Sequence, residues 1–266
     1  MPAVLETARL IARRFDSYME GVAVRPIASG FVAVDPVSNL TLPTTDEGDA
    51  EIVKQAREAF ESFMRAHEVP QQAQPGPAKY SWNWVRPAAE DDSFVGSYGR
   101  LFDLAVLGRP GRGPQHPRML PLEAALFESG HPVLLVPRVA PRVLGQNVLI
   151  AWNGSTEQAR TNTFALPLLR EAERVTVLTV QGGAMHGPSG EQAADYLRRH
   201  AVPATAVTVA PGSRTTGEAV LEQAKTLGCD LLVKGAYTQS RLSQMIFGGT
   251  TRHILANAEL PVFMAH

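Results

Sequence analysis

The sequence predicts an α/β fold built from two tandem copies of one parallel-sheet unit. Short apolar runs alternate with segments of helical periodicity along most of the chain, the pattern of a mostly parallel sheet covered by helices on both faces. The chain is also self-similar: DLAVLG at 103–108 resembles DLLVKG at 230–235, and PVLLV at 132–136 resembles PVFMA at 261–265. We therefore expect domains at residues 1–140 and 146–266, with the Pro/Gly-containing segment APRVLG at their boundary.

The first copy begins within a helix, because Val4, Ala8, Ile11 and Phe15 recur at helical spacing. A strand at 18–24 and a long Pro-rich loop at 25–47 follow. The remaining elements alternate as helices at 49–67 and 119–128, and strands at 80–85, 104–107 and 133–136. The aromatic residues of the 80–85 strand share one face and are expected to pack rather than stack on bases, because no basic residues interleave them.

The second copy shows the complete alternation. Strands are expected at 148–152, 175–180, 205–209, 231–233 and 262–265, and helices at 156–170, 191–200 and 215–227. Ser155 or Thr156 is the candidate cap of the first helix. A last helix is expected after Gly248-Gly249-Thr250-Thr251. Right-handed crossovers leave few topologies for this order of elements.

A strand precedes the first helix in the second copy, and none precedes it in the first. We expect the first copy to have one strand fewer, unless a segment such as 31–34 fills the vacancy. A natural chain that starts upstream of Met1 would explain this difference. The alternative is a complete chain in which another segment takes the place of the strand.

Composition narrows the class of protein. The net charge is -1, so no bulk field attracts the chain to nucleic acid or to an anionic membrane. Apolar runs such as 133–136 are too short to span a bilayer, and no secretory signal pattern opens the chain. The single cysteine, Cys229, excludes an internal disulfide framework and favours a reducing, cytoplasmic setting. At a strand start, it is expected to be a small core residue.

The segment from Gly235 to His266, GAYTQSRLSQMIFGGTTRHILANAELPVFMAH, resembles the C-terminal segment of the universal stress protein family. The family signature is Gly, two residues, Gly, nine residues, Gly, then Ser or Thr. Gly235 and Gly248 match it, whereas Thr238 stands at the second glycine and Gly249 at the first hydroxyl. The resemblance implies two doubly wound parallel-sheet domains of strand order 3-2-1-4-5, the first degenerate and lacking its first strand.

The resemblance also implies a site for ATP or another adenine nucleotide in the second copy. Independently, small residues at a helix start suit an anion, because the first backbone N–H groups lack helical partners. The candidate binding residues are Asn153, Gly154, Val180, Gly235, Thr238, Gly248, Gly249, Thr250 and Thr251. Asn153, Gly154 and Val180 would contact the nucleoside. Gly235, Thr238 and the residues from Gly248 to Thr251 would contact the phosphates. Asn153 stands where the family commonly has an acidic residue.

The corresponding loop of the first copy, GRPGRGPQHPR, contains Gly108, Gly111 and Gly113 without the nine-residue spacing. Arg109 and Arg118 are among the arginines that add positive charge to it. We interpret this copy as degenerate.

Other chemistry is not indicated. The seven histidines lack metal-ligand spacing, and one cysteine excludes a thiolate zinc cluster. AWNGS lacks the nucleophile-elbow pattern, so no catalytic residue and no enzymatic activity are predicted.

We expect a stress-response regulator that binds an adenine nucleotide. Its copies should form an intramolecular pseudo-dimer, with the 133–136 and 262–265 strands close together, and a homodimer is a further candidate assembly. The alternatives are a scaffold of the same fold that binds no nucleotide and, more remotely, a nucleotide-hydrolysing enzyme.

Overall fold

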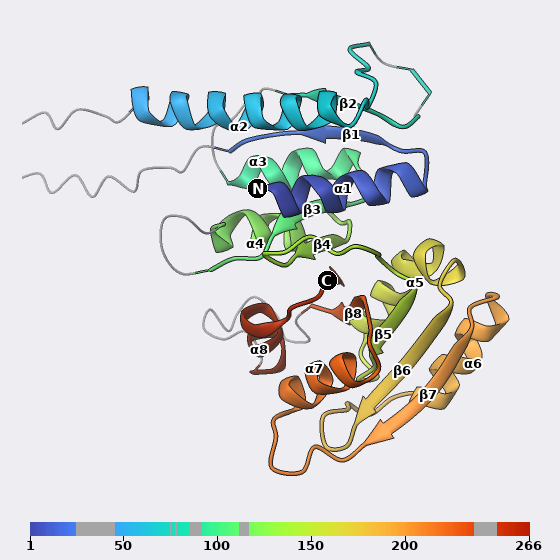
Figure 1. Cartoon of the computed structure of the whole chain (residues 1–266). Coiled ribbons are helices and arrows are strands. Elements are labelled where there is room, and N and C mark those ends of the chain that lie inside the picture. Colours follow the sequence, from blue (N-terminus) through green and yellow to red (C-terminus); the bar gives the residue numbers. More distant parts are fainter. Residues whose placement is uncertain (25–45, 75, 78, 86–91, 112–116, 237–248) are drawn as a thin grey trace, which may run out of the picture. The chain divides into compact units, whose positions relative to one another are not determined.

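Figure 1 shows the computed structural model, which describes residues 1–24, 46–74, 76–77, 79–85, 92–111, 117–236 and 249–266. Residues 1–10 and 96–266 form one compact unit, and residues 11–95 form the other. The helix α1 (Pro2–Arg14) has residues in both units. Within the described part of the chain, no helix combines the length and the apolar character that crossing a membrane requires.

The larger unit contains a seven-stranded sheet of order β3-β4-β9-β8-β5-β6-β7. Its strands are β3 (Ala105–Gly108), β4 (Val133–Val136), β5 (Asn147–Ala151), β6 (Arg174–Val180), β7 (Ala204–Val209), β8 (Leu231–Gly235) and β9 (Val262–Ala265). Its helices are α4 (Met119–Glu128), α5 (Thr156–Arg170), α6 (Gly190–Arg199), α7 (Thr216–Thr226) and α8 (Gly249–Asn257), with a 3-10 turn at Gly99–Leu101. The helix α3 (Ser93–Tyr98), like α1, has residues in both units.

The second copy has the strand order that the resemblance implies. β5 is central and pairs in parallel with β6, Val148 opposite Val175, and with β8, Val148 opposite Leu231. β7 lies beyond β6 and β9 beyond β8, so the order in chain terms is 3-2-1-4-5. Figure 1 shows α5 and α6 on one side of these strands and α7 and α8 on the other. Right-handed crossovers require this division, because the chain reverses its direction across the sheet after β7.

Local sequence explains where two of these helices begin. Ser189 accepts a hydrogen bond from the amide of Gln192, whose side chain accepts one from the amide of Ser189. Thr215 and Glu218 form the same reciprocal capping box at the start of α7. Each box satisfies two backbone N–H groups that would otherwise lack partners, so α6 and α7 begin at defined residues.

The two copies join through their last strands. β4 and β9 pair antiparallel, with Val133 opposite Met264, Leu134 opposite Phe263 and Leu135 opposite Val262. The predicted proximity of these two strands is confirmed. Both strands are buried along their whole length. Their pairing therefore satisfies the backbone N–H and C=O groups along two strand edges and closes an apolar core.

The strands of the first copy belong to two different sheets. β3 and β4 join the large sheet, whereas β1 (Tyr18–Gly21) and β2 (Ser81–Trp84) pair in parallel with each other. In the described residues the first copy therefore has four strands and the second has five, as predicted. In the order 3-2-1-4-5, strand 1 lies between strands 2 and 4. β1 and β3 correspond to strands 2 and 4 of the first copy, and they belong to different sheets. The 31–34 segment lies outside the described residues.

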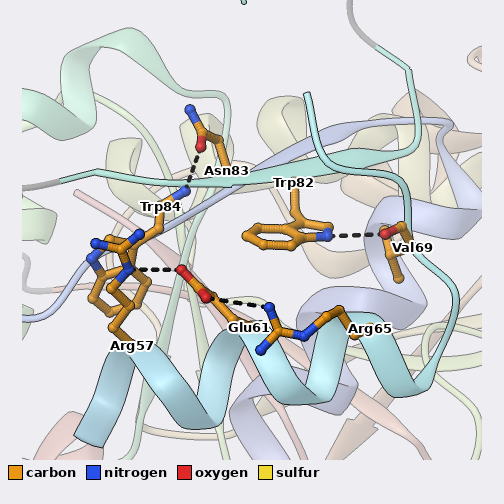
Figure 2. A network of polar contacts seen from close by, with 7 residues as sticks. All are labelled: Arg57, Glu61, Arg65, Val69, Trp82, Asn83 and Trp84. Atoms are coloured by element: carbon orange, nitrogen blue, oxygen red, sulfur yellow. Dashed lines mark hydrogen bonds and ion pairs between the residues drawn. The ribbon is translucent and has the colours of Figure 1, made fainter. Parts of the chain in front are cut away.

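In the smaller unit, α2 (Asp46–Ala66) supplies the rings that cover β1 and β2. The Phe60 ring lies 5.6 Å from the Trp82 ring, edge-on, and 5.4 Å from the Trp84 ring. Trp82 is buried, and its Nε1 donates to the Val69 carbonyl at 2.9 Å (Figure 2). Gly21 lies beneath these rings, where a Cβ would approach the Phe60 ring to 2.8 Å. The predicted packing role of the aromatic strand is confirmed.

The outer part of α2 carries an ion-pair network, also drawn in Figure 2. Glu61 accepts from Arg57 Nε at 2.7 Å and from Arg65 Nη1 at 3.4 Å. These hydrogen bonds, that from Arg57 foremost, lower the pKa of Glu61. Exposed pairs of this kind contribute only about 0.3–0.5 kcal/mol each, so the rings rather than the charges hold this unit together.

The boundary segment is fixed by Asp230, at the start of β8. Its Oδ1 accepts from the Gly145 amide at 2.6 Å, and both carboxylate oxygens accept from the Gln146 amide at 3.1 Å. Oδ2 also accepts from the Asn147 amide at 3.1 Å. One side chain therefore aligns the first residues of β5 beside β8, which starts the second copy in register.

Some sequence-based expectations were wrong in detail. Cys229, expected in the core, is only partly buried, and burial with the charge of Asp230 raises the pKa of its thiol to about 11. The strand expected at 18–24 ends at Gly21. Helix α3 was not anticipated, because its six residues, SFVGSY, are too few to establish a period.

Asp230→Asn should lower the free energy of unfolding by about 1–3 kcal/mol, because an NH₂ group would face backbone N–H donors and a charged acceptor would be lost. Asp103 is its counterpart in the first copy and is exposed. Asp103→Asn makes the same chemical change and should alter stability by less than about 0.5 kcal/mol. Urea denaturation of both variants measures the difference. Equal effects would show that the hydrogen bonds from the backbone amides to Asp230 contribute nothing to the free energy of unfolding.

Candidate functional site

The candidate site lies at the carboxyl ends of three adjacent parallel strands, β6, β5 and β8. Val180 ends β6, Asn153 and Gly154 follow β5, and Gly235 ends β8. Ligands of open α/β sheets bind at this edge, where neighbouring strands connect in opposite directions. The topology thus brings these predicted residues to one edge. Thr238 and Gly248 lie outside the described residues.

Gly235 is needed for packing between β8 and α5. A Cβ on it would lie 2.6 Å from the backbone nitrogen of Gln158, so no larger residue fits without moving the helix. The Gly235 amide donates to Gln158 Oε1 at 2.7 Å, and Gln158 Nε2 donates to Asn162 at 2.9 Å. Both side chains are buried. The amide of Gly235 is therefore committed to α5 and is not a free donor for a phosphate.

Asn153 and Gly154 are held by the loop that follows β6. The carbonyl of Asn153 accepts from the Met185 amide at 2.8 Å, and Trp152 Nε1 donates to the Pro188 carbonyl at 2.8 Å. Gly154 has φ +77°, and a Cβ there would meet the Met185 carbonyl at 3.2 Å. Asn153 Oδ1 accepts from the Ser155 amide at 3.2 Å. Within the described chain, the Asn153 side-chain NH₂ keeps its donors available for a ligand.

Val180 is buried, and its backbone is also engaged. Its carbonyl accepts from the Gly183 amide at 3.1 Å, and the next amide, of Gln181, donates to Val209 at 2.9 Å. A turn thus closes immediately after β6. A nucleoside that bound the backbone here would have to accommodate that turn.

The start of α8 is the remaining part of the predicted set that the structure describes. Gly249 is its first residue, and a Cβ built there would meet no described atom within 4 Å. The first N–H groups of any helix lack helical acceptors and carry partial positive charge. Thr250 is half-buried, whereas the side chain of Thr251 is buried and contacts Lys234 of β8. Of these three residues only Gly249 is exposed.

Sequence reasoning missed Lys234, the residue before Gly235. Its side chain is 7% exposed, and Nζ donates to Thr251 Oγ1 at 2.9 Å and to the Gly235 carbonyl at 2.7 Å. Burial lowers the pKa of Lys234 to about 8, and the charge of Glu157 partly opposes this shift. The hydrogen bond to Thr251 places the ammonium group beside the first turn of α8. The sequence signal that could have identified it is a charged residue directly after the apolar run LLV at 231–233.

These features define an α/β domain with a doubly wound sheet, in which a helix start and a buried lysine lie at the carboxyl ends of the strands. Residues 145–266 match the sequence profile of the Universal stress protein family. The match covers the C-terminal part of the chain, which is therefore similar to this family.

Solved structures agree on the fold. A universal stress protein from Archaeoglobus fulgidus DSM 4304 is similar over 99% of this chain and 90% of its own, with TM-score 0.71 and 14% identity. The universal stress protein UspA from Lactobacillus plantarum matches 47% of this chain and 100% of its own, with TM-score 0.39 and 17% identity. The second TM-score is too low to support a structural comparison. The first similarity, at 14% identity, concerns the fold alone. No curated protein matches the chain in sequence.

Gly235→Ala and Gly249→Ala should separate packing from ligand approach. We expect Gly235→Ala to lower the free energy of unfolding by about 2–4 kcal/mol, because its Cβ would overlap the backbone of α5. Gly249→Ala adds the same methyl group in open space and should change stability by less than about 0.5 kcal/mol. Thermal and urea unfolding measure both. A neutral Gly235→Ala would disprove the close packing of β8 on α5.

Lys234→Met should reveal the buried ammonium through pH. The pKa of Lys234 is 10.5 in the unfolded chain and about 8 in the folded chain. Between pH 8 and pH 10.5 the unfolded chain therefore binds more protons than the folded chain, so the wild type gains stability as pH rises through this range. The methionine variant lacks this gain. Its stability relative to wild type should therefore fall by roughly 2–3 kcal/mol from pH 7 to pH 10. Urea denaturation at both values measures it, and a constant difference would contradict the lowered pKa.

Proposed function

We propose that the second domain binds an adenine nucleotide, ATP being the first candidate, and that the chain acts as a non-catalytic stress-response regulator in the cytoplasm. The supporting observation is the arrangement of Lys234 beneath Gly249–Thr251 at the ligand edge of the sheet. A buried ammonium and the first N–H groups of a helix supply charge and donors of the kind that phosphates take. The single cysteine supports a reducing compartment.

In this proposal the residues divide the work differently from the family signature. Gly235 positions β8 against α5, and its amide takes no part in binding. The phosphates lie over the start of α8, where Lys234 supplies the charge. Asn153 donates its side-chain NH₂ to the nucleoside, beside Gly154 and Val180. Thr238 and Gly248 remain part of the proposed phosphate loop on sequence grounds.

The alternative function is a scaffold that binds no nucleotide. It is favoured by the commitments already described, since the amide of Gly235 and the carbonyls of Asn153 and Val180 all have protein partners. In that case the domain would act through its surfaces, alone or as a homodimer. Direct measurement of nucleotide binding distinguishes the two functions.

Gly249→Val should abolish ATP binding without unfolding the chain. The Cβ of a branched side chain there would meet no described atom within 4 Å, and its methyl groups would occupy the approach of a phosphate to the helix start. Ala256→Val adds similar bulk to the exposed, opposite end of α8 and should bind like wild type. Isothermal titration with Mg-ATP measures all three proteins. Equal affinities for wild type and Gly249→Val would show that the phosphates do not bind at α8.

A second variant tests the alternative function. Thr238→Gly with Gly249→Ser restores the family pattern and should strengthen binding about ten- to a hundredfold, the value of one good hydrogen bond to a charged group. Absence of heat from the wild type, with clear binding by this double variant, would support the scaffold.

ATP affinity should also fall as pH rises above about 8. A bound polyphosphate stabilises the charged form of Lys234, which exists below its pKa of about 8 and is lost above it. Titrations at pH 7 and pH 9.5 should differ by up to about tenfold in the wild type. Lys234→Met should bind more weakly and show little change between these values. A pH-independent wild type would exclude Lys234 from the site.

A further inference from the structure

The outer edge of β7 has no strand beside it in the described part of the chain. β7 is the last strand on its side of the large sheet, and it pairs in parallel with β6 over its whole length, from Ala204 to Val209. The register runs without interruption, so no bulge turns the edge away from a partner. A continuous strand edge of this kind can pair with a further strand.

Alternate residues of β7 direct their backbone groups toward β6. The carbonyl of Pro203, just before β7, accepts from the Val175 amide at 3.1 Å. The carbonyl of Val209, at the other end, accepts from the Gln181 amide at 2.9 Å. Because the hydrogen bonds of a parallel ladder recur at every second residue, the odd-numbered residues of β7 face β6. The even-numbered residues therefore direct their N–H and C=O groups away from the sheet.

Two of the three even-numbered residues keep these groups for a partner. Ala204 is already engaged, since its carbonyl accepts from Arg198 Nη1 at 2.9 Å and its amide donates to the Val202 carbonyl at 2.8 Å. Ala206 and Thr208 each present an N–H and a C=O group with which no described strand pairs. Thr208 is exposed and Ala206 is half-buried, so another strand can reach this part of the edge.

The side chains of β7 do not protect the edge. Its sequence, ATAVTV, contains no charged residue and no proline, the residues with which edge strands commonly prevent further pairing. Val207 and Val209 lie on the same face of the strand, and both are only half-buried. Pairing with a further strand would remove more of their apolar surface from water.

The charges beside the edge favour a second copy of this chain. Arg198 bonds the outward carbonyl of Ala204, which places one flank of α6 at the edge, and Figure 1 shows α6 beside β7. The first turn of α6 carries Glu191, and its last turn carries Arg198 and Arg199. A two-fold axis through the edge would set two α6 helices antiparallel. The acidic start of each helix would then lie beside the basic end of the other.

We propose that the chain forms a homodimer in which β7 pairs antiparallel with β7 of a second copy. Residues opposite each other in such a pair share a face of the sheet, as Ala206 and Thr208 do. Pairing these two residues uses all four outward groups of each copy. It places Val207 opposite the partner's Val207 on the two-fold axis, in a non-hydrogen-bonded pair whose Cα atoms are about 4.5 Å apart.

A cross-link in the whole chain tests the register. Val207→Cys should form an intermolecular disulfide on mild oxidation, because disulfides join Cα atoms about 4.4–6.8 Å apart. Thr205→Cys lies on the same face and is more exposed, but it should not cross-link, since four residues of offset separate it from its copy by about 13 Å. Both variants carry Cys229→Ser, which removes the native thiol. Non-reducing electrophoresis measures the product. Equal cross-linking at both positions, or none at 207, would overturn the proposal.

The oligomeric state tests the same interface without a cross-link. Sedimentation equilibrium of the wild type should give the mass of a dimer, and the absence of nucleotide keeps this result independent of the proposed function. Val207→Lys should weaken the dimer at least about tenfold, because two like charges would meet on the axis. Thr163→Lys adds the same charge at an exposed position on α5 and should remain dimeric.

Two outcomes of this measurement would contradict the homodimer. A monomeric wild type would overturn it and leave the edge of β7 to another part of the chain or to a strand of a different protein. Undiminished dimerisation of Val207→Lys, with circular dichroism showing a folded chain, would place the interface elsewhere and overturn it as well.

Discussion

The antiparallel pairing of β4 with β9 is the interaction on which the larger unit depends. Each strand would otherwise be the apolar edge of a parallel sheet, with an exposed row of N–H and C=O groups. Pairing Leu134 opposite Phe263 satisfies both rows and makes one seven-stranded sheet from the last two strands of the first copy and the five strands of the second. It also brings the connection before β9, with Glu259, into the electrostatic environment of Arg109 in the first copy. The charge balance at the first-copy edge is therefore set by both halves of the chain.

The second constraint is the close approach of β8 to α5. Gly235 permits this approach because it has no side chain. The buried side-chain Oε1 of Gln158 fixes the approach by accepting a hydrogen bond from the Gly235 amide. Gly235, which the family resemblance assigned to the phosphate loop, thus has a sufficient explanation in packing. The same approach places Lys234 in the interior, where its ammonium connects the end of β8 to the first turn of α8. Packing and the proposed binding function therefore share one short segment.

The two ends of the large sheet carry different charged side chains. At the end of β8 a buried lysine contacts the first turn of α8, whereas Arg109 follows β3. Both residues lie at the carboxyl ends of parallel strands. They differ in the neighbouring strand, since β8 has β5 beside it and β3 ends the large sheet.

The sequence by itself determined the alternation of strands and helices in the second copy, whereas the order of its strands came from the family resemblance. The alternation follows from local signals, such as the apolar run of β5 and the Ser155 cap of α5, which act over a few residues. Other features needed the tertiary structure. Cys229 is only partly buried, Gln158 accepts from Gly235, and Nη1 of Arg109 is buried without an acceptor among the described residues. The burial and hydrogen bonds of these groups depend on residues distant in the chain, so folding rather than sequence spacing decides them.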